Sequence, residues 1–328
     1  MTKTIFLHIG IPKTGTSSIQ NFFYQKREEL KSHGLLYPIT ASSGLGTEHY
    51  LLSDALGFGK KHRVNEREKE LSDMARSLEK EIKKSSAHSV LFSSECFYIP
   101  NDIEPVKAFF SDYEVCIVVY LRRHDTWWPS AYSQTVKTVK SPPWNRSIEA
   151  YINFSKNRPQ RPSYRTLVDR WAKVFGKENM IIRPYEGQQN QPDLIADILT
   201  AINFQSAIPL KSTIGVESKN QSLPYAKLSL IDIYQRANID PNIRNRLINS
   251  VLSQPSNNQE SNSLISPKLQ LQLIEENMAD YEYIAREYLG REDGKLFYDP
   301  LPDPDTPWHA PKHPTFMSVV EQTIQGLG

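Results

Sequence analysis

Cysteine is scarce in this sequence, which has only Cys96 and Cys116 among its 328 residues. Two cysteines exclude the disulfide framework of a small secreted scaffold, and alone they are too few for a zinc site. An excess of one charge is also lacking, since 39 basic residues face 37 acidic ones and the formal net charge is +2. Nucleic-acid-binding proteins usually show a strong basic field. We therefore expect a cytoplasmic protein with no nucleic-acid partner and no metal site.

Long hydrophobic runs are missing as well. A membrane span needs about 20 consecutive apolar residues, and no window of the sequence approaches that length. The apolar run near the N-terminus breaks at Gly10 and Pro12, so it is too short for a signal peptide. We expect no transmembrane segment and no secretory leader.

Strand and helix patterns alternate along the first two thirds of the chain. Continuous apolar runs typical of buried strands occur at residues 4–9, 89–92, 115–121 and 180–183. Helical spacing of apolar residues occurs at 66–84, 127–139, 164–175 and 194–202. This order predicts an α/β fold of the P-loop NTPase-like type, in which helices flank a parallel sheet.

The strand signal fades beyond residue 215. Residues 224–237 and 269–289 have helical patterns, whereas the tail from Tyr298 is rich in proline and is expected to be irregular. We therefore predict one domain over residues 1–328, with an α/β core over about 1–215 and helical additions over about 216–328.

A loop with phosphate-binding character joins the first predicted strand to the first helix. It runs from Gly10 to Ser18 with the sequence GIPKTGTSS. Where a strand gives way to a helix, backbone N–H groups and the helix dipole favour an anion. Lys13 adds a full positive charge, and the threonine and serine hydroxyls of the loop add donors. The segment is therefore a candidate anion site.

The loop departs from the Walker A pattern G-x-x-x-x-G-K-[ST], in which lysine directly follows the second glycine. Thr16 stands in that place here, and Lys13 comes three residues earlier. The strongest strand pattern, residues 115–121, ends at Arg122 and Arg123 instead of an acidic residue that would hold Mg²⁺. A sugar or small-molecule kinase that uses ATP and Mg²⁺ is therefore the weaker interpretation.

The segment HIGIPKTGTSSIQ, His8–Gln20, resembles the phosphosulfate loop of sulfotransferases that use 3′-phosphoadenosine-5′-phosphosulfate (PAPS), and in particular their bacterial, carbohydrate-modifying branch. The resemblance implies that the 5′-phosphosulfate is bound by Pro12, Lys13, Thr14, Gly15, Thr16, Ser17 and Ser18. It also implies that Lys13 stabilises the charge that develops on the leaving oxygen when the S–O bond breaks. The resemblance to the family extends from residue 4 to about residue 237.

The same resemblance implies a binding site for the 3′-phosphate of PAPS. The family places an arginine at the end of a central strand and a serine eight residues later, and Arg122 and Ser130 have this spacing. Arginine suits phosphate because its planar fork makes charge-assisted hydrogen bonds. Arg123 is the alternative, but Ala131 stands eight residues after it. Trp127 and Trp128, in the helix that follows, are interpreted as packing residues.

A general base would remove the proton of the acceptor hydroxyl. Cytosolic members of the family place a histidine at the end of the preceding strand, and the residue reached here is Glu95. His49, His8 and His124 remain alternative bases. Two further segments, 183–186 and 218–223, also resemble family segments, and no role is assigned to them.

The sequence thus predicts a PAPS-dependent sulfotransferase with Lys13 and Glu95 as catalytic residues. The acceptor is expected to be a glycan or glycolipid, and no metal is required. The alternatives are the Mg²⁺–ATP-dependent kinase and a non-catalytic nucleotide-binding protein of the same fold. The sequence indicates neither the particular acceptor nor the oligomeric state.

Overall fold

The computed structural model describes residues 3–42, 46–59, 64–157, 163–213, 223–254 and 263–327. The chain divides into two compact units. Unit 1 comprises residues 1–123, 159–217 and 277–299. Unit 2 comprises residues 124–158, 218–276 and 300–328. Most of segment 218–223 lies outside the described residues.

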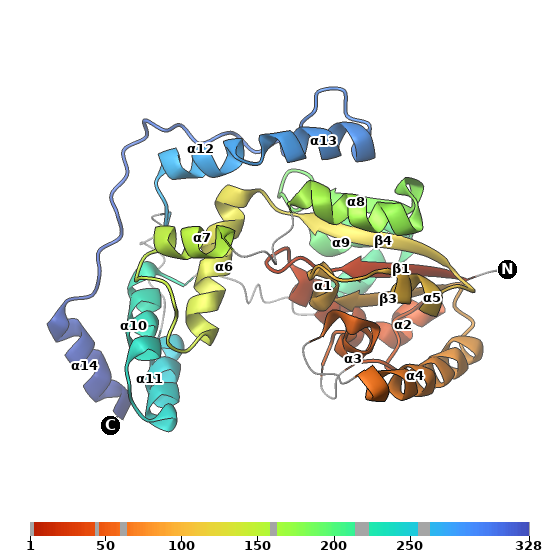
Figure 1. The fold of residues 1–328 in the computed structure, drawn as a ribbon, viewed down its shortest axis with the longest axis horizontal. Helices are drawn as coiled ribbons and strands as arrows, with labels where there is room; N and C mark the ends of the chain where they lie inside the picture. The colour runs from red at the N-terminus through yellow and green to blue at the C-terminus, as the bar shows by residue number, and fades with distance from the viewer. Residues whose placement is uncertain are drawn as a thin grey trace. The chain divides into compact units, whose positions relative to one another are not determined.

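Unit 1 is built on a five-stranded sheet with the order β2-β3-β1-β4-β5, and each neighbouring pair is parallel (Figure 1). The strands are β1 Thr4–Ile9, β2 Leu35–Leu36, β3 Ser89–Ser94, β4 Glu114–Leu121 and β5 Met180–Pro184. Strands β1, β3 and β4 are buried over most of their length, which fits the apolar residues at their centres. The predicted parallel α/β fold is confirmed.

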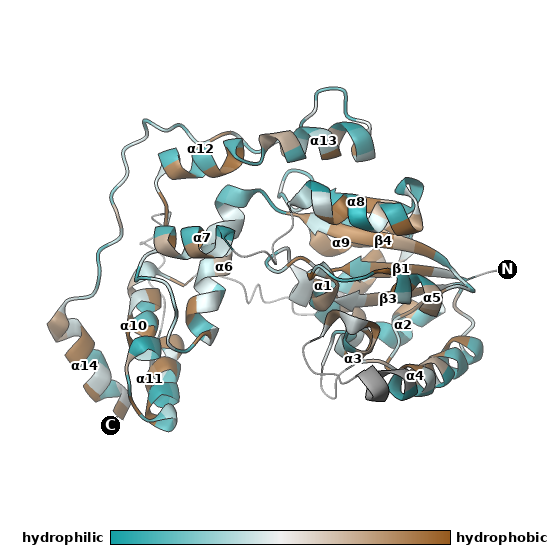
Figure 2. Cartoon of the chain, in the orientation of Figure 1, coloured by the Kyte–Doolittle hydropathy of each residue, from teal (hydrophilic) through white to brown (hydrophobic). Residues whose placement is uncertain are grey.

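Helices of unit 1 flank this sheet. They are α1 Thr16–Gln25, α2 Arg27–Ser32, α3 Tyr50–Ser53, α4 Val64–Lys84, α5 Glu104–Phe109, α8 Tyr164–Phe175, α9 Leu194–Ala201 and α13 Met278–Leu289. Phe6 and Val118 of the strands share one buried cluster with Phe23 of α1 and Ile198 of α9. Figure 2 shows the contrast between the largely hydrophobic strands and the mostly hydrophilic α4, which is a surface helix as its spacing predicts.

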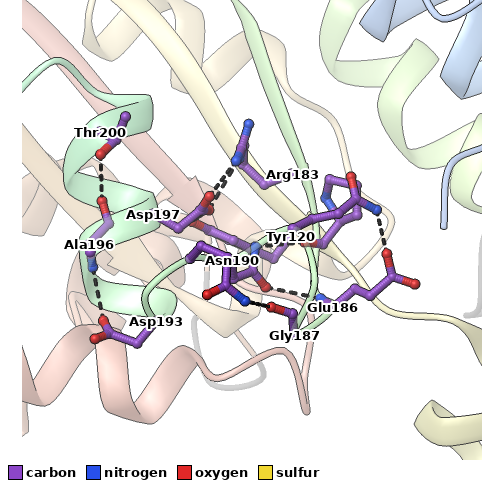
Figure 3. Close-up of polar contacts among 12 residues, drawn as sticks. Tyr120, Arg183, Glu186, Gly187, Asn190, Asp193, Ala196, Asp197 and Thr200 are labelled. Atoms are coloured by element: carbon purple, nitrogen blue, oxygen red, sulfur yellow. Dashed lines mark hydrogen bonds and ion pairs between the residues drawn. The ribbon is translucent and has the colours of Figure 1, made fainter. Parts of the chain in front are cut away.

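A buried polar contact also fastens α9 to the sheet. The Tyr120 hydroxyl of β4 donates to Asp197 Oδ2 at 2.6 Å, and Arg183 of β5 donates to both oxygens of the same carboxylate (Figure 3). The negative charge of the Asp197 carboxylate is therefore balanced by Arg183, and the carboxylate is hydrogen-bonded, as a buried charge requires. The contact links the carboxyl halves of β4 and β5 to α9.

Unit 2 is helical in its described residues. Its helices are α6 His124–Thr138, α7 Ile148–Lys156, α10 Tyr225–Arg236, α11 Pro241–Ser253, α12 Pro267–Glu275 and α14 Phe316–Leu327. Trp127 and Trp128 of α6 are 5% and 4% exposed, and they pack with α7 and α10. Their interpretation as packing residues is confirmed.

Residues 269–289 are helical as their pattern predicts, in α12 and α13, which are separated by Glu276 and Asn277. One expectation for the C-terminal part was wrong. The tail from Tyr298 was expected to be irregular throughout, but it ends in α14. The prolines before α14 favoured an irregular interpretation of the whole tail, although the residues after them have helical spacing. The α14 helix buries no residue.

Candidate functional site

The carboxyl ends of four neighbouring strands bring the candidate residues to one edge of the sheet. Ile9 of β1 lies opposite Ser94 of β3, and Leu121 of β4 lies opposite Pro184 of β5. Residues that directly follow these strands are therefore neighbours at this edge. They include the anion loop after β1, Glu95 after β3 and Arg122 after β4. In open parallel sheets, ligands usually bind at this edge.

The anion loop, residues 10–15, turns tightly between β1 and α1. Lys13 and Gly15 have φ values of 71° and 79°, both in the left-handed region. The α1 helix begins at Thr16, and its N-cap residue, Gly15, has no side chain that could cap the first turn. The first N–H groups of a helix have no partner within the helix. An anion at this position would therefore meet backbone donors and the positive end of the helix dipole.

The threonines of the loop hold its shape. The Thr14 hydroxyl donates to the Ile11 carbonyl at 2.7 Å, and the Thr16 hydroxyl donates to the same carbonyl at 3.2 Å. Both side chains are buried, whereas Ser17 is exposed and Ser18 is half-buried. In the described geometry, Thr14 and Thr16 thus stabilise the loop internally, and the two serines lie at the surface of α1.

Glycine is required at position 15 for two reasons. The left-handed φ strains other residues, and a Cβ there would lie 2.2 Å from Cδ2 of Leu194 and 3.0 Å from Cε2 of Tyr185. A Cβ at Gly10 would lie 2.6 Å from Cγ2 of Thr16. The loop is therefore packed closely between its own residues, the start of α9 and the segment after β5.

Glu95 lies beside this loop. It opens a short 3₁₀ helix, Glu95–Tyr98, and its Cγ would be 3.4 Å from a Cβ placed on Gly10. Burial raises the pKa of the Glu95 carboxyl, and the nearby Glu48 carboxylate raises it further. A hydrogen bond with Thr16 and the charge of Lys13 oppose this shift, but the pKa remains above its usual value. The structure thus brings Lys13, Thr16 and Glu95 together.

Two of the three alternative bases are buried inside unit 1. Burial lowers the pKa of His8 to about 4, and its Nδ1 contacts the Ser93 hydroxyl at 2.8 Å. The pKa of His49 is also lowered by burial to about 4. Its Nε2 donates to the Pro38 carbonyl and its Nδ1 accepts from the Ser93 amide, so both ring nitrogens have backbone partners. The third alternative, His124, is the first residue of α6 in unit 2.

The two adjacent arginines have different partners. Nη1 of Arg122 donates to the Lys13 carbonyl at 2.8 Å, and its guanidinium lies 5.4 Å from the centre of the Tyr185 ring. Nη1 of Arg123 instead donates to the Asp299 carbonyl at 2.7 Å. Arg122 is therefore the arginine that reaches the anion loop. Ser130 lies half-buried on α6 in unit 2, and its predicted role stays a prediction.

Tyr164 and Tyr185 are contacts of the site that the sequence did not predict. The Tyr164 hydroxyl of α8 donates to the Arg122 carbonyl at 2.8 Å and fixes the backbone after β4. Tyr185 borders Gly15 and Arg122. A useful signal for Tyr185 was its place directly after a predicted strand, where parallel neighbours converge. No comparable signal marks Tyr164, which lies within an amphipathic helix.

In the described part of the chain, the histidines, cysteines, aspartates and glutamates form no group suited to holding a metal ion. Among the same residues, no helix combines the length and apolar character needed to cross a membrane.

Known proteins offer distant similarities. No family model matches the chain. An uncharacterized protein of Archaeoglobus fulgidus is 26% identical over 208 residues, which cover 61% of this chain and 54% of that protein. The chain thus matches about half the length of this relative.

Two solved structures are distantly similar to the chain. Mouse sulfotransferase SULT7A1 complexed with PAP is 15% identical with a TM-score of 0.36, covering 73% of this chain and 69% of that one. A sulfotransferase from Alicyclobacillus acidocaldarius is 13% identical with a TM-score of 0.37, covering 84% of this chain and 96% of that one.

Proposed function

We propose that this protein is a sulfotransferase that binds PAPS at the anion loop and transfers its sulfuryl group to an acceptor hydroxyl. The observation that carries the proposal is the grouping of the start of α1, Lys13, Glu95 and Arg122 at one edge of the sheet. This arrangement offers donors and positive charge to an anion, with a carboxyl of raised pKa beside it. These are the groups that sulfuryl transfer requires.

Glu95 is the general base in this proposal. It accepts the proton of the acceptor hydroxyl while the acceptor oxygen forms a bond to sulfur and the bond from sulfur to the phosphate oxygen breaks. The electron pair of the broken bond remains on that phosphate oxygen, where the Lys13 ammonium stabilises the charge. A raised pKa suits this role, because a base is most effective when its pKa approaches the working pH.

The proposed nucleotide contacts fit the residues present. Residues 12–18, from the anion loop and the start of α1, would hold the 5′-phosphosulfate, and Arg122 would hold the 3′-phosphate, with Ser130 as its predicted partner. Arg122 already points toward the loop, since it donates to the Lys13 carbonyl. A guanidinium is suited to this contact, because it carries five N–H donors in a planar fork. No metal takes part in this scheme.

The acceptor is proposed to be a glycan or glycolipid, as in the bacterial branch that the loop sequence resembles. Location in the cytoplasm is part of the same proposal, and the low cysteine content supports it. Neither the kinase nor the non-catalytic alternative is favoured by a specific feature of the site.

Transfer of label from sulfur-35 PAPS to a panel of glycans, glycolipids and phenols, in the presence of EDTA, tests the proposal. Wild-type protein should label at least one acceptor. Glu95→Gln should lower turnover about 10²–10⁴-fold, the usual contribution of a general base, while PAP binding changes less than about twofold. The matched control is Glu114→Gln, an exposed glutamate at the opposite end of β4, which should keep full activity.

Three results would argue against the proposal. Phosphorylation of an acceptor by ATP with Mg²⁺, and no use of PAPS, would support the kinase. PAP binding without turnover of any acceptor would support the non-catalytic alternative. Unchanged turnover in Glu95→Gln would exclude Glu95 as the base.

A further inference from the structure

Residues 290–299, here called the strap, follow α13 and lie against the turn after β5. The backbone amide of Tyr298 donates to Glu186 Oε2 at 2.9 Å, and the amide of Asp299 donates to Glu186 Oε1 at 2.5 Å. Each carboxylate oxygen thus accepts from one strap amide. Glu186 is only 6% exposed, and the strap is more than 100 residues away along the chain.

Further hydrogen bonds join the strap to the same turn. Nε2 of Gln189 donates to Glu186 Oε2 at 2.5 Å and to the Leu296 carbonyl at 3.0 Å. Arg291 donates to Gln189 Oε1 at 2.6 Å and to the Leu296 carbonyl at 3.0 Å. The Glu186 carboxylate is therefore satisfied by three N–H groups from two segments. Charged acceptors of this kind make the stronger protein hydrogen bonds.

The strap is connected to the arginine pair on its other side. The Asp299 carbonyl accepts from Arg123 at 2.7 Å, while the Asp299 amide is held by Glu186. Glu186 also directly follows Tyr185, whose ring lies 5.4 Å from the Arg122 guanidinium. The buried Glu186 carboxylate thus binds Asp299, the partner of Arg123, and its residue adjoins Tyr185, the neighbour of Arg122. In Figure 3, its side chain extends away from the neighbouring Asp197 contact.

We infer that Glu186 is a positioning residue that selects which arginine meets the nucleotide. By fixing Asp299, it provides a carbonyl that engages Arg123. Because the two arginines are adjacent, holding Arg123 also fixes the backbone from which Arg122 reaches the anion loop. Glu186 itself touches neither the loop nor the reacting atoms. The inference rests on the proposed function, since it assigns Arg122 to the 3′-phosphate.

The test compares dissociation constants of PAP and adenosine 5′-phosphate (AMP), which differ in the 3′-phosphate. Their ratio measures the contribution of that phosphate. In Glu186→Gln, an NH₂ group faces one of the strap amides, so the strap loosens. The PAP-to-AMP preference should fall about tenfold, which corresponds to about 1.4 kcal/mol, while AMP affinity changes less than about twofold. Glu114→Gln should leave both constants unchanged.

A second variant keeps the test informative if Glu186→Gln folds poorly. Arg123→Ala leaves Glu186 intact but removes the link from the strap to the arginine pair. It should reduce the PAP-to-AMP preference to a similar extent. The double variant should lose no more of the PAP-to-AMP preference than either single variant, because both changes break the same chain of contacts.

Hydrogen–deuterium exchange separates this inference from the proposed function. In Glu186→Gln without ligand, exchange should increase in peptides that cover the strap and in the peptide that contains Arg122. If exchange increases in this way but the wild-type protein does not prefer PAP to AMP, the proposed function is contradicted and the positioning role of Glu186 is not. A wild-type PAP preference that Glu186→Gln leaves unchanged, additive losses in the double variant, or unchanged exchange at Arg122, would overturn the inference.

Discussion

Glu95 occupies a position where opposing influences act on one carboxyl. Burial and the Glu48 carboxylate raise its pKa, whereas Thr16 and Lys13 lower it. The influences that raise the pKa would favour uptake of a proton from an acceptor, and those that lower it would keep part of the carboxyl ionised. At the residue scale, the pKa of the Glu95 carboxyl is therefore determined by its neighbours as well as by its own burial.

Glu48→Gln should change the pH dependence of turnover. A base must be deprotonated to act, so kcat should rise with pH through the pKa of Glu95. Removing the Glu48 carboxylate removes one cause of the raised pKa, and the acidic limb of the profile should move to lower pH. The measurement is kcat against pH for wild type, Glu48→Gln and Glu114→Gln. An acidic limb that stays in place in Glu48→Gln would exclude the proposed coupling.

Lys13 and Arg122 show what the sequence could and could not predict at this scale. The loop pattern marked Lys13, and the end of a strong strand marked the arginine pair. Arg123 donates to the carbonyl of Asp299, which lies far along the chain, and the sequence carries no local signal of that contact. The choice of Arg122 over Arg123 rested on the spacing to Ser130 and stays a prediction.

The anion loop is the element on which the site depends. Its two left-handed residues and its packing against Leu194 leave room for a hydrogen at position 15 and nothing larger. The strand before the loop was predicted with the bounds that the structure shows, because the apolar run stops at Gly10. The tertiary contact with α9 was not predicted, because periodicity does not reveal which helix packs on which loop.

Gly15→Ala should therefore damage both stability and binding. The left-handed conformation and the close approach of Leu194 should together lower the free energy of unfolding by about 1–3 kcal/mol. Affinity for PAP should fall as well, because the loop must shift. Gly187→Ala is the matched control, since a Cβ there has no neighbour within 4 Å. Urea denaturation checks the stabilities, and equal values for the two variants would contradict this account of the loop.

At the scale of the whole molecule, unit 1 is assembled from separated parts of the chain. Residues 277–299 belong to it, although they follow most of unit 2 in the sequence. Tyr283 and Tyr288 of α13 both donate to Asp169 of α8, at 3.1 and 2.6 Å, and the strap binds Glu186. The predicted core over about 1–215 lacks these contacts; the single domain over 1–328 stays a prediction. Hydrophobic patterns indicate elements, but not that a late helix returns to the first unit.

A polypeptide ending at residue 215 should consequently be much less stable than the full chain. It would leave the buried Glu186 carboxylate without its two strap amides, and removal of partners from a buried charge is strongly destabilising. Circular dichroism on heating should show a broad or absent transition, with aggregation in size-exclusion chromatography. A cooperative transition and PAP binding equal to those of the full chain would show that residues 277–299 are dispensable.

The most direct test of the central claim is isothermal titration calorimetry of the full chain with PAP in the presence of EDTA, beside AMP and ATP. The account predicts that PAP binds, that its 3′-phosphate is needed for full affinity, and that neither ATP nor Mg²⁺ is required. Lys13→Ala and Arg122→Ala should each weaken PAP about 10–100-fold, as expected when a hydrogen bond to a charged group is lost. Absence of PAP binding, or binding of ATP only when Mg²⁺ is added, would contradict the account and favour the kinase.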